Sequence, residues 1–429
     1  MKRIFSIILA ALMILCSAAC GSGNQQEEQK GFEPELDAAT ACKISIVGSY
    51  SNFEALEAEF DRFNEYYPNV EMSYTKIDDY NNSIAAVLNG NDAPNIFFSF
   101  SWMTGNAAYD SVFACMENLA DDSLGLDLDC IRPGLLNRDA QGNVLTVPIF
   151  STSYGMLINN DLFEKEGLKV PATLQELFDV CASFRDKGYA SPMMGYSAKS
   201  SGCMMNTVVY PVFAGTLAEH PEMVARANQC DPAAGEYMRP ALEVLSQLID
   251  NGCIVLEKCD EIGDNYSEVI MRFFEGDVPM MICTGDTVSG TGKRESQSEA
   301  FTAHPFAYSF APIPTTDKGG YFLDSPSVQF SVNNSCGDLD MTNEFMRFLI
   351  SNTELNQMAS VKRLITPSND LSFDKVYAPV GDVAPELIIS PTALGIEDTL
   401  AVQVRLASYM VGRGELTIDE AVAKYGSLE

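Results

Sequence analysis

The residues of this chain that are best suited to chemistry lie in polar loops that follow predicted strands. They combine aromatic rings with amide, hydroxyl and carboxylate groups, and they are Tyr50, Ser51, Asn52, Ser99, Ser101, Trp102, Ser151, Thr152, Asn206, Thr207, Asp286, Thr287, Asp324 and Ser325. A neutral sugar suits such a set, because its C–H face can lie on an aromatic ring while polar groups satisfy its hydroxyls. We predict ligand contacts by Tyr50, Asn52, Ser101, Trp102, Ser151, Thr207, Asp286, Thr287 and Asp324.

Two of these residues have an alternative role. Trp102 is the only tryptophan, and it stands in a polar loop where exposure of its ring would need a reason. It is either a platform for a ligand or an anchor for the rim or the core. Asp286 is either a sugar contact or a solvated loop carboxylate. Tyr154, by contrast, is expected to pack within a strand.

The sequence does not favour catalysis. Its two histidines, His220 and His304, each stand directly before a proline and belong to no recognisable metal or triad motif. No GxSxG, HExxH, P-loop or GxGxxG motif occurs in its required context. Adjacent acids such as Asp78 and Asp79 point in different directions from a helix or strand. We therefore predict a protein that is not an enzyme and that holds no cofactor or metal.

The elements that would position the polar loops alternate between strands and helices. The opening part of the chain predicts strands over 42–50, 70–77 and 93–102 and helices over 51–68 and 78–92. This alternation implies a mostly parallel sheet covered by helices, which is an α/β fold. Ligands of open α/β sheets bind beyond the carboxyl ends of the strands, where these loops lie.

The stretch 147–196 predicts the handover from one part of the fold to another. Its apolar run SYGMLI, preceded by Pro148, is typical of a buried strand. A helix follows after Thr173, which can be its N-cap with Glu176 as capping-box partner, and the helix ends at Gly188. The segment therefore predicts a strand, a loop and an amphipathic helix in that order.

The order of these short motifs resembles that of family 1 extracellular solute-binding proteins, the ligand-capturing components of ABC importers. The residues that match in the stretch just described are Pro148, 159–163, Gly167, Leu168, Pro171, Ala172 and Thr173. Matches elsewhere are Tyr67, Pro68, Val70, Asn91, Ala93, Pro94, Asn95, Ile96, Phe274, Gly276, Met280 and Gly285. The segments EFMRFLIS and ELTIDEA also agree, so the resemblance runs in family order from about Lys43 to the end of the sequence.

The resemblance implies a two-lobed, periplasmic-binding-protein-like (type II) fold, in which each lobe is a mostly parallel sheet flanked by helices. The chain would cross between the lobes near Pro148, near Pro314 and near Lys362. The lobes would be discontinuous, with residues 42–148 and 315–361 in lobe 1 and residues 149–314 and 362–429 in lobe 2.

The resemblance also implies a function and its partners. The protein would capture a carbohydrate, with an oligosaccharide favoured, close its lobes around it, and deliver it as a monomer to ABC permease subunits driven by an ATPase. The same fold could instead bind a metal ion, a polyamine or a peptide. A surface glycan-degrading enzyme would require paired carboxylates in a cleft. An adhesion or scaffold lipoprotein would lack a solute-sized cleft.

The first residues have the pattern of a bacterial lipoprotein signal. Two basic residues precede an apolar run over 4–15, and small residues stand before Cys20. We predict a signal peptide over 1–19, a lipid on Cys20 and a flexible linker over 20–41. The protein would then be anchored to the membrane at the cell surface or in the periplasm. An ordinary cleaved signal peptide is the alternative.

The composition limits the possible partners and cross-links. Lys and Arg number 27 against 59 Asp and Glu, a formal net charge of −32, so nucleic acid and anionic lipid surfaces are poor partners. Of the 12 cysteines, Cys16 and Cys20 fall in the signal region. The others stand mostly within apolar patterns and form no CxxC pair, so we predict buried free thiols.

Overall fold

The computed structural model describes residues 31–100, 103, 107–198, 204–263, 266–371 and 374–429. The predicted signal peptide, the lipid site Cys20 and part of the linker lie outside the described residues, as do Ser101 and Trp102. Leu36–Glu429 forms one compact unit, and the few described residues before Leu36 lie outside this larger unit. All helices and strands of the described residues belong to the larger unit.

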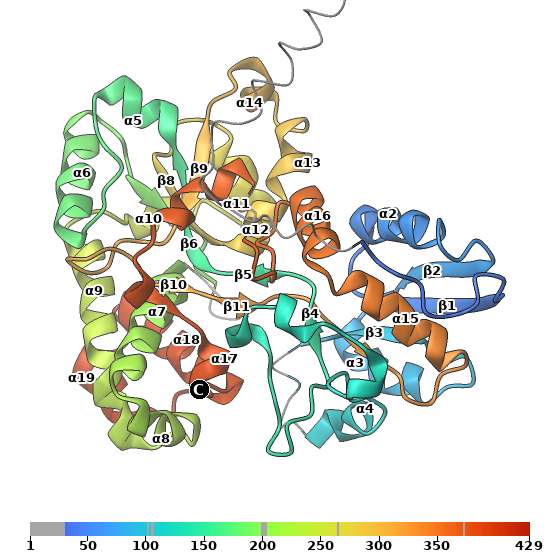
Figure 1. Ribbon diagram of the computed structural model, residues 1–429. Coiled ribbons are helices and arrows are strands. Elements are labelled where there is room, and N and C mark those ends of the chain that lie inside the picture. Colours follow the sequence, from blue (N-terminus) through green and yellow to red (C-terminus); the bar gives the residue numbers. More distant parts are fainter. Residues whose placement is uncertain (1–30, 101–102, 104–106, 199–203, 264–265, 372–373) are drawn as a thin grey trace, which may run out of the picture. The chain divides into compact units, whose positions relative to one another are not determined.

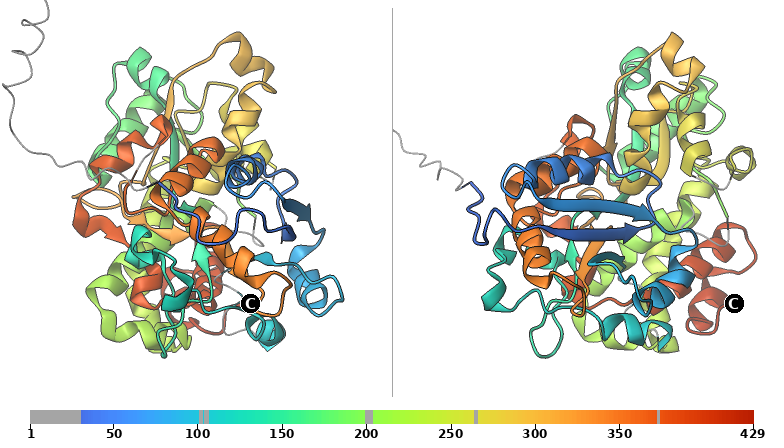
Figure 2. Two further views of the ribbon diagram at one scale, coloured as in Figure 1. Left: turned by 45° about the vertical axis from the view of Figure 1, so that its right-hand side comes forward. Right: turned by 90° about the vertical axis from the view of Figure 1, so that its right-hand side faces the viewer.

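Five strands form the first sheet, in the order β2-β1-β3-β12-β4 (Figure 1). Their bounds are Val70–Lys76 (β2), Cys42–Gly48 (β1), Ile96–Ser99 (β3), Gln329–Val332 (β12) and Val147–Pro148 (β4). The helices of this part are α2 (Glu54–Phe63), α3 (Tyr80–Leu88), α4 (Asp110–Phe113), α15 (Leu339–Leu349) and α16 (Asn352–Lys362). Figure 2 shows the orange helices α15 and α16 beside the blue helix α2, although they are far apart from it in the sequence.

Four strands form the second sheet, in the order β7-β8-β6-β9. Their bounds are Met193–Met194 (β7), Met280–Thr284 (β8), Tyr154–Asn159 (β6) and Tyr308–Ala311 (β9). The longer helices of this part are α5 (Asn160–Glu166), α6 (Leu174–Asp186), α7 (Met204–Glu219), α9 (Arg239–Asp250), α11 (Tyr266–Phe273), α18 (Asp398–Gly412) and α19 (Ile418–Ala423). Its shorter helices are α8 (Val224–Asn228), α10 (Leu256–Cys259), α12 (Gly285–Ser289), α13 (Thr291–Glu295), α14 (Glu299–Ala303) and α17 (Pro391–Leu394).

Two short ladders lie in the passages between the sheets. β5 (Ser151–Thr152) pairs antiparallel with β11 (Ser325–Pro326), and β10 (Phe322–Leu323) pairs parallel with β13 (Ile388–Ile389). After β9 the chain thus passes through β10 and β11 before it joins the first sheet at β12. The division of the chain into two lobes at Pro148, Pro314 and Lys362 stays a prediction.

Helix boundaries follow local sequence signals. The backbone N–H of Glu176 donates to the Thr173 hydroxyl over 3.3 Å, and the Glu176 carboxylate accepts from the N–H of Ala172 at 2.7 Å. At α19, Thr417 and Glu420 form a complete capping box. These contacts satisfy N–H groups that the first turn of a helix leaves unpaired. The predicted alternation of strands and helices at the start of the chain is confirmed.

The α/β fold class is confirmed, and in each sheet one strand runs against the others. β12 is antiparallel to both β3 and β4, and β6 is antiparallel to both β8 and β9. A strand that is reached through a covering helix starts from the same edge of the sheet as the strand before it. β6 and β12 instead follow directly after the β5–β11 ladder, so each enters its sheet from the opposite end.

The cysteines of the described part are free thiols, as predicted. Five of them are buried, namely Cys130, Cys181, Cys253, Cys259 and Cys283, whereas Cys42, Cys115, Cys230 and Cys336 are only half-buried. Cys203 lies outside the described residues.

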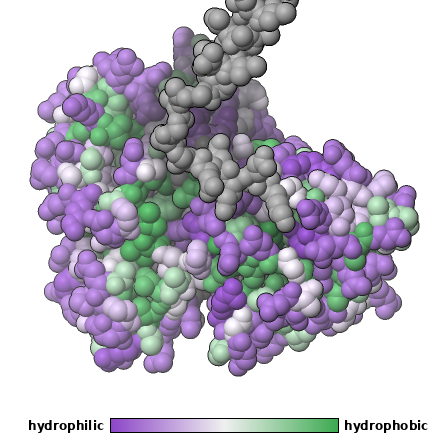
Figure 3. Space-filling view, in the orientation of Figure 1, coloured by the Kyte–Doolittle hydropathy of each residue, from purple (hydrophilic) through white to green (hydrophobic). Residues whose placement is uncertain are grey.

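The surface is mostly hydrophilic in the view of Figure 3, in keeping with the acidic composition. None of the helices that the structure describes has the length and apolar character needed to cross a membrane.

Helices α2 and α16 pack together around a buried pair of carboxyl groups. Glu59 is fully buried and faces the carboxyl of Glu354, while the Arg62 guanidinium lies 3.4 Å from one of its oxygens. Burial, with a contribution from Glu354, raises the pKa of Glu59 to about 9, although Arg62 opposes the shift. Two facing acceptors need a shared proton, so Glu59 is protonated in the folded protein at neutral pH.

We expect Glu59→Gln to stabilise the protein at alkaline pH but not at pH 4. Glu59 binds its proton more tightly in the folded state, so wild-type stability falls as pH rises from the ordinary glutamate pKa towards 9. Glutamine never ionises and avoids this loss, which we expect to be about 2–4 kcal/mol at pH 8. Thermal unfolding of both proteins at pH 4 and pH 8 measures the difference. The exposed Glu57→Gln on the same helix is the control, and an equal effect of both substitutions would contradict the interpretation.

Candidate functional site

The carboxyl ends of the strands in the first sheet lie at one edge with the start of β12. β1 and β3 are parallel, and the register pairs Gln329, the first residue of β12, with Ser99, the last residue of β3. The segments that follow β1 and β3, with Tyr50, and the segment that precedes β12, with Ser327, therefore lie at this edge. Ser99 itself is buried and bonds to the Ser331 hydroxyl at 2.7 Å, so it has an internal partner.

The second sheet has an equivalent edge. Tyr154, which begins β6, is paired with Thr284, which ends β8, so Thr152 lies beside the start of α12 with Asp286 and Thr287. β7 runs parallel to β8, and the chain leaves it at the same edge before α7 begins at Met204. Asn206 and Thr207 are buried in the first turn of α7. The side-chain oxygen of Asn206 has no partner among the described residues.

A hydrogen bond joins the two edges. The Ser327 hydroxyl, just before β12, donates to the Asp286 carboxylate in α12 at 2.6 Å. The β5–β11 ladder brings the edges together, because Thr152 and Ser325 are paired in it. The edge residues of both sheets thus form one candidate site at the passage between the sheets.

Asp286 is an exposed carboxylate with protein packed close around it. Its side chain reaches solvent, yet the surrounding protein raises its pKa by desolvation, against the opposing hydrogen bonds of Ser327 and Thr152. Both statements hold for a carboxylate that is crowded from several sides but open to a solute. Such a group is suited to accept hydrogen bonds from the hydroxyls of a ligand.

Two of the residues predicted to bind ligand have their polar atoms engaged inside the protein. The Asp324 carboxylate binds the Arg132 guanidinium through two bonds of 2.7 Å, and the Ser151 hydroxyl accepts from Arg132 at 2.8 Å. Arg132 also donates to the carbonyl oxygens of Thr366, at 2.5 Å, and of Ser368, at 2.9 Å. All five N–H donors of the guanidinium are therefore used. Their acceptors lie on the three segments that pass between the sheets, namely those with Ser151, with Asp324, and with Thr366 and Ser368.

Tyr50 lies beside a cation that the sequence did not point to. Its half-buried ring packs edge-on against Phe53 and Phe98, with centroid distances of 5.2 and 5.4 Å. The Lys362 ammonium lies over the ring, 5.1 Å from its centroid. Lys362 ends α16, where a lysine is ordinary because its charge interacts favourably with the helix dipole, so no sequence signal marks it as a site residue.

The remaining predicted residues are placed less centrally or lie outside the described part. Asn52 is exposed and donates to the Glu54 carboxylate at 2.8 Å. Thr287 is almost fully buried, and its hydroxyl lies 3.5 Å from that of Thr284. Ser101 and Trp102 come after β3 in the sequence but are not among the described residues.

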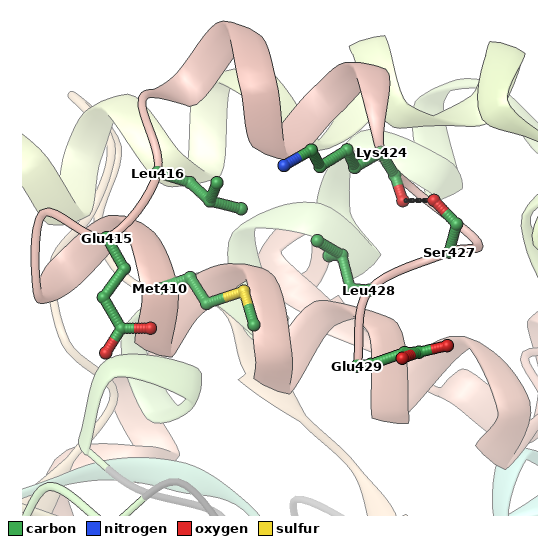
Figure 4. Close-up of a pocket in the computed structure, with 7 residues that line it drawn as sticks. All are labelled: Met410, Glu415, Leu416, Lys424, Ser427, Leu428 and Glu429. Atoms are coloured by element: carbon green, nitrogen blue, oxygen red, sulfur yellow. Dashed lines mark hydrogen bonds between the residues drawn. The ribbon is translucent and has the colours of Figure 1, made fainter.

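A separate hollow of about 320 Å³ lies between α18, α19 and the end of the chain (Figure 4). Figure 4 shows Met410, Leu416 and Leu428 around it, with the Lys424 side chain above them. It contains none of the strand-end residues, and its only drawn hydrogen bond runs from the Ser427 hydroxyl to the carbonyl of Lys424 at 2.9 Å. We therefore place the candidate site at the sheet edges.

The described residues contain no group of three or more His, Cys, Asp and Glu side chains that could hold a metal ion. The candidate site consists instead of hydroxyl, amide, carboxylate, ammonium and aromatic groups. These groups are suited to bind a polar organic solute.

Comparison with known proteins agrees with this arrangement. The sequence profile of the family described as bacterial extracellular solute-binding protein matches residues 58–378. No curated protein sequence matches the chain.

Many solved structures are similar to the chain in fold. The apo-form of RafE from Streptococcus pneumoniae has a TM-score of 0.68 at 15% identity, over 91% of this chain and 97% of RafE. The GacH receptor of Streptomyces glaucescens, solved unliganded and with acarbose, has a TM-score of 0.65 at 19% identity, over 90% and 97%. A chitin oligosaccharide binding protein has a TM-score of 0.65 at 15% identity, over 90% and 97%. At these identities the likeness establishes a common fold.

We expect Arg132→Lys to destabilise the protein, because lysine cannot reproduce five directed hydrogen bonds and leaves Asp324 poorly paired in a buried place. Lysine keeps the positive charge but leaves buried acceptors without donors, so we expect a loss of about 1–3 kcal/mol, less than the cost of removing the charge. Denaturant unfolding measures the loss. Arg138→Lys is the matched control, since Arg138 is exposed and makes one bond, of 3.3 Å, to the Gly142 carbonyl. Equal stability of the two variants would contradict the role of Arg132.

Proposed function

Because this chain belongs to the bacterial extracellular solute-binding proteins, we propose that it captures a carbohydrate outside the cytoplasm for an ABC importer. The observation that carries the proposal is the meeting of two sheet edges at Ser327 and Asp286, where an aromatic ring and groups for hydroxyl recognition gather. RafE has been solved with raffinose, and other proteins of the same fold with acarbose and stachyose. These ligands favour an oligosaccharide.

The proposed mechanism is closure of two lobes around the sugar. Lobe 1 comprises residues 42–148 and 315–361, and lobe 2 residues 149–314 and 362–429. Each lobe contributes one sheet edge, so a ligand that contacts Tyr50 on one side and Asp286 on the other favours the closed state over the open one. The closed protein, as a monomer, docks on the permease subunits, and their ATPase drives import. The sugar is bound and released without chemical change.

The proposed location is the cell surface or the periplasm. A signal peptide over 1–19 is removed, and a lipid on Cys20 holds the protein to the membrane through the linker 20–41. The lipid anchor keeps the binding protein near the permease, and this raises the effective concentration of one partner for the other.

We expect a group of related oligosaccharides to raise the thermal midpoint of the purified protein, because a ligand that binds only the folded state stabilises it. Mono- and oligosaccharides, metal ions, polyamines and short peptides are compared on one plate, and the glycans are analysed afterwards. If only a non-sugar solute raises the thermal midpoint, the assignment to solute-binding proteins stands and the proposal of a carbohydrate ligand is wrong. Loss of the glycan with formation of products would favour the glycan-degrading enzyme.

Once a binding sugar is known, we expect Asp286→Asn to weaken its affinity about 10- to 100-fold, because a hydrogen bond to a charged acceptor contributes about 1.5–3 kcal/mol. Asparagine keeps an oxygen for the Ser327 hydroxyl, so the fold should not change. Isothermal titration calorimetry gives the affinities. Asp317→Asn, in an exposed turn, is the control. If Asp286→Asn binds the sugar with unchanged affinity, Asp286 is a solvated loop carboxylate and not a sugar contact.

A further inference from the structure

We propose that the captured saccharide carries an anionic group, a carboxylate, sulfate or phosphate, that pairs with Lys362 beside the ring of Tyr50. This inference rests on the proposed function, since it names the chemical class of the same ligand. It departs from the neutral sugar that the loop residues alone favour.

The position of Lys362 is the first observation. Its ammonium lies 5.1 Å from the ring centroid of Tyr50 and 6.0 Å from that of Phe53. A saccharide that lies near Tyr50 at this edge would therefore come within reach of the ammonium. The interaction of a cation with an aromatic face holds the side chain in place without using its N–H donors, which stay available to an acceptor.

The lack of a counter-ion is the second observation. Lys362 is half-buried, yet it makes no ion pair with any carboxylate of the described residues. Its neighbour Arg363, by contrast, pairs with Glu295 at 2.6 Å and donates to the Tyr308 hydroxyl at 2.9 Å. In a chain with 59 acidic residues, an unpaired and half-buried cation at the candidate site needs an explanation.

The charged groups that face Lys362 do not supply this counter-ion. Burial is the main cause that lowers the pKa of Lys362, and Lys293 in α13 adds repulsion, while Glu54 opposes both. Glu54 lies on the exposed surface and accepts from Asn52 at 2.8 Å, and it is not within ion-pair distance of Lys362. An anionic group on the ligand would compensate the partly desolvated charge, which is a gain that a neutral sugar does not provide.

The two ends of the site would then recognise different groups. Asp286, on the edge of the second sheet, accepts hydrogen bonds and repels anions, whereas Lys362, beside the edge of the first sheet, attracts them. An acidic saccharide would be bound in one orientation, with its hydroxyls towards Asp286 and its anionic group towards Lys362. Like-charge repulsion disfavours the reverse orientation.

The test compares matched ligands with the purified protein by isothermal titration calorimetry. The pairs are uronate-containing oligosaccharides and their carboxyl-reduced neutral forms, with sulfated and phosphorylated sugars as further arms that identify the anion. We expect at least about a tenfold preference for an acidic member, shrinking in 0.5 M salt as the charges are screened. Binding of neutral sugars with equal or higher affinity would overturn the anionic class and leave the carbohydrate function intact. Failure of every saccharide to bind would overturn both.

Variants of Lys362 locate the preference. Lys362→Met keeps the length of the side chain but removes the charge, and we expect it to reduce the ratio of acidic to neutral affinity to about one, a loss of at least about tenfold. Lys362→Arg should keep a preference, and it tests the charge if the methionine variant does not fold. Lys318→Met, in an exposed turn, is the control. An undiminished ratio in Lys362→Met would overturn the assignment to this residue.

Discussion

One guanidinium connects the three passages between the two sheets. Arg132 binds Ser151 in the first passage, Asp324 in the second and the carbonyls of Thr366 and Ser368 in the third. Its planar group directs five donors at once, which an ammonium cannot do. Because the edge residues follow directly from these passages, their positions depend on this one contact. The bond between Ser327 and Asp286 is close to it, since Ser327 directly follows β11 and Thr152 of β5 lies beside the start of α12, which carries Asp286.

The same contact explains why the sequence could predict polar side chains at the strand ends but not their partners in the fold. Ser151 and Asp324 belong to loops at strand ends, as ligand residues do, but their partner Arg132 is 19 and 192 residues away. A side chain that binds an internal partner and one that awaits a ligand have the same residue types in the sequence. Only the fold tells them apart, and it assigns these two to the passages.

Elements with local signals were predicted well, and pairings between distant strands were not. Thr173 and Glu176 cap their helix as expected, because the contact spans three residues. The direction of β12 depends instead on a passage from the second sheet, which no local pattern encodes. Lys362 was missed for a related reason, since only the packing of α16 against α2 brings a common helix-end residue to Tyr50.

The proposed anionic ligand must be reconciled with a net charge of −32. At physiological ionic strength the Debye length is about 8 Å, so the acidic surface slows the approach of an anion only weakly and a contact pair is barely screened. The surface charge therefore acts on the rate of encounter, and Lys362 acts on the bound state. Glu59 and Glu354 follow the same logic within the fold, because a shared proton keeps part of this negative charge out of the interface between α2 and α16, the helix that ends in Lys362.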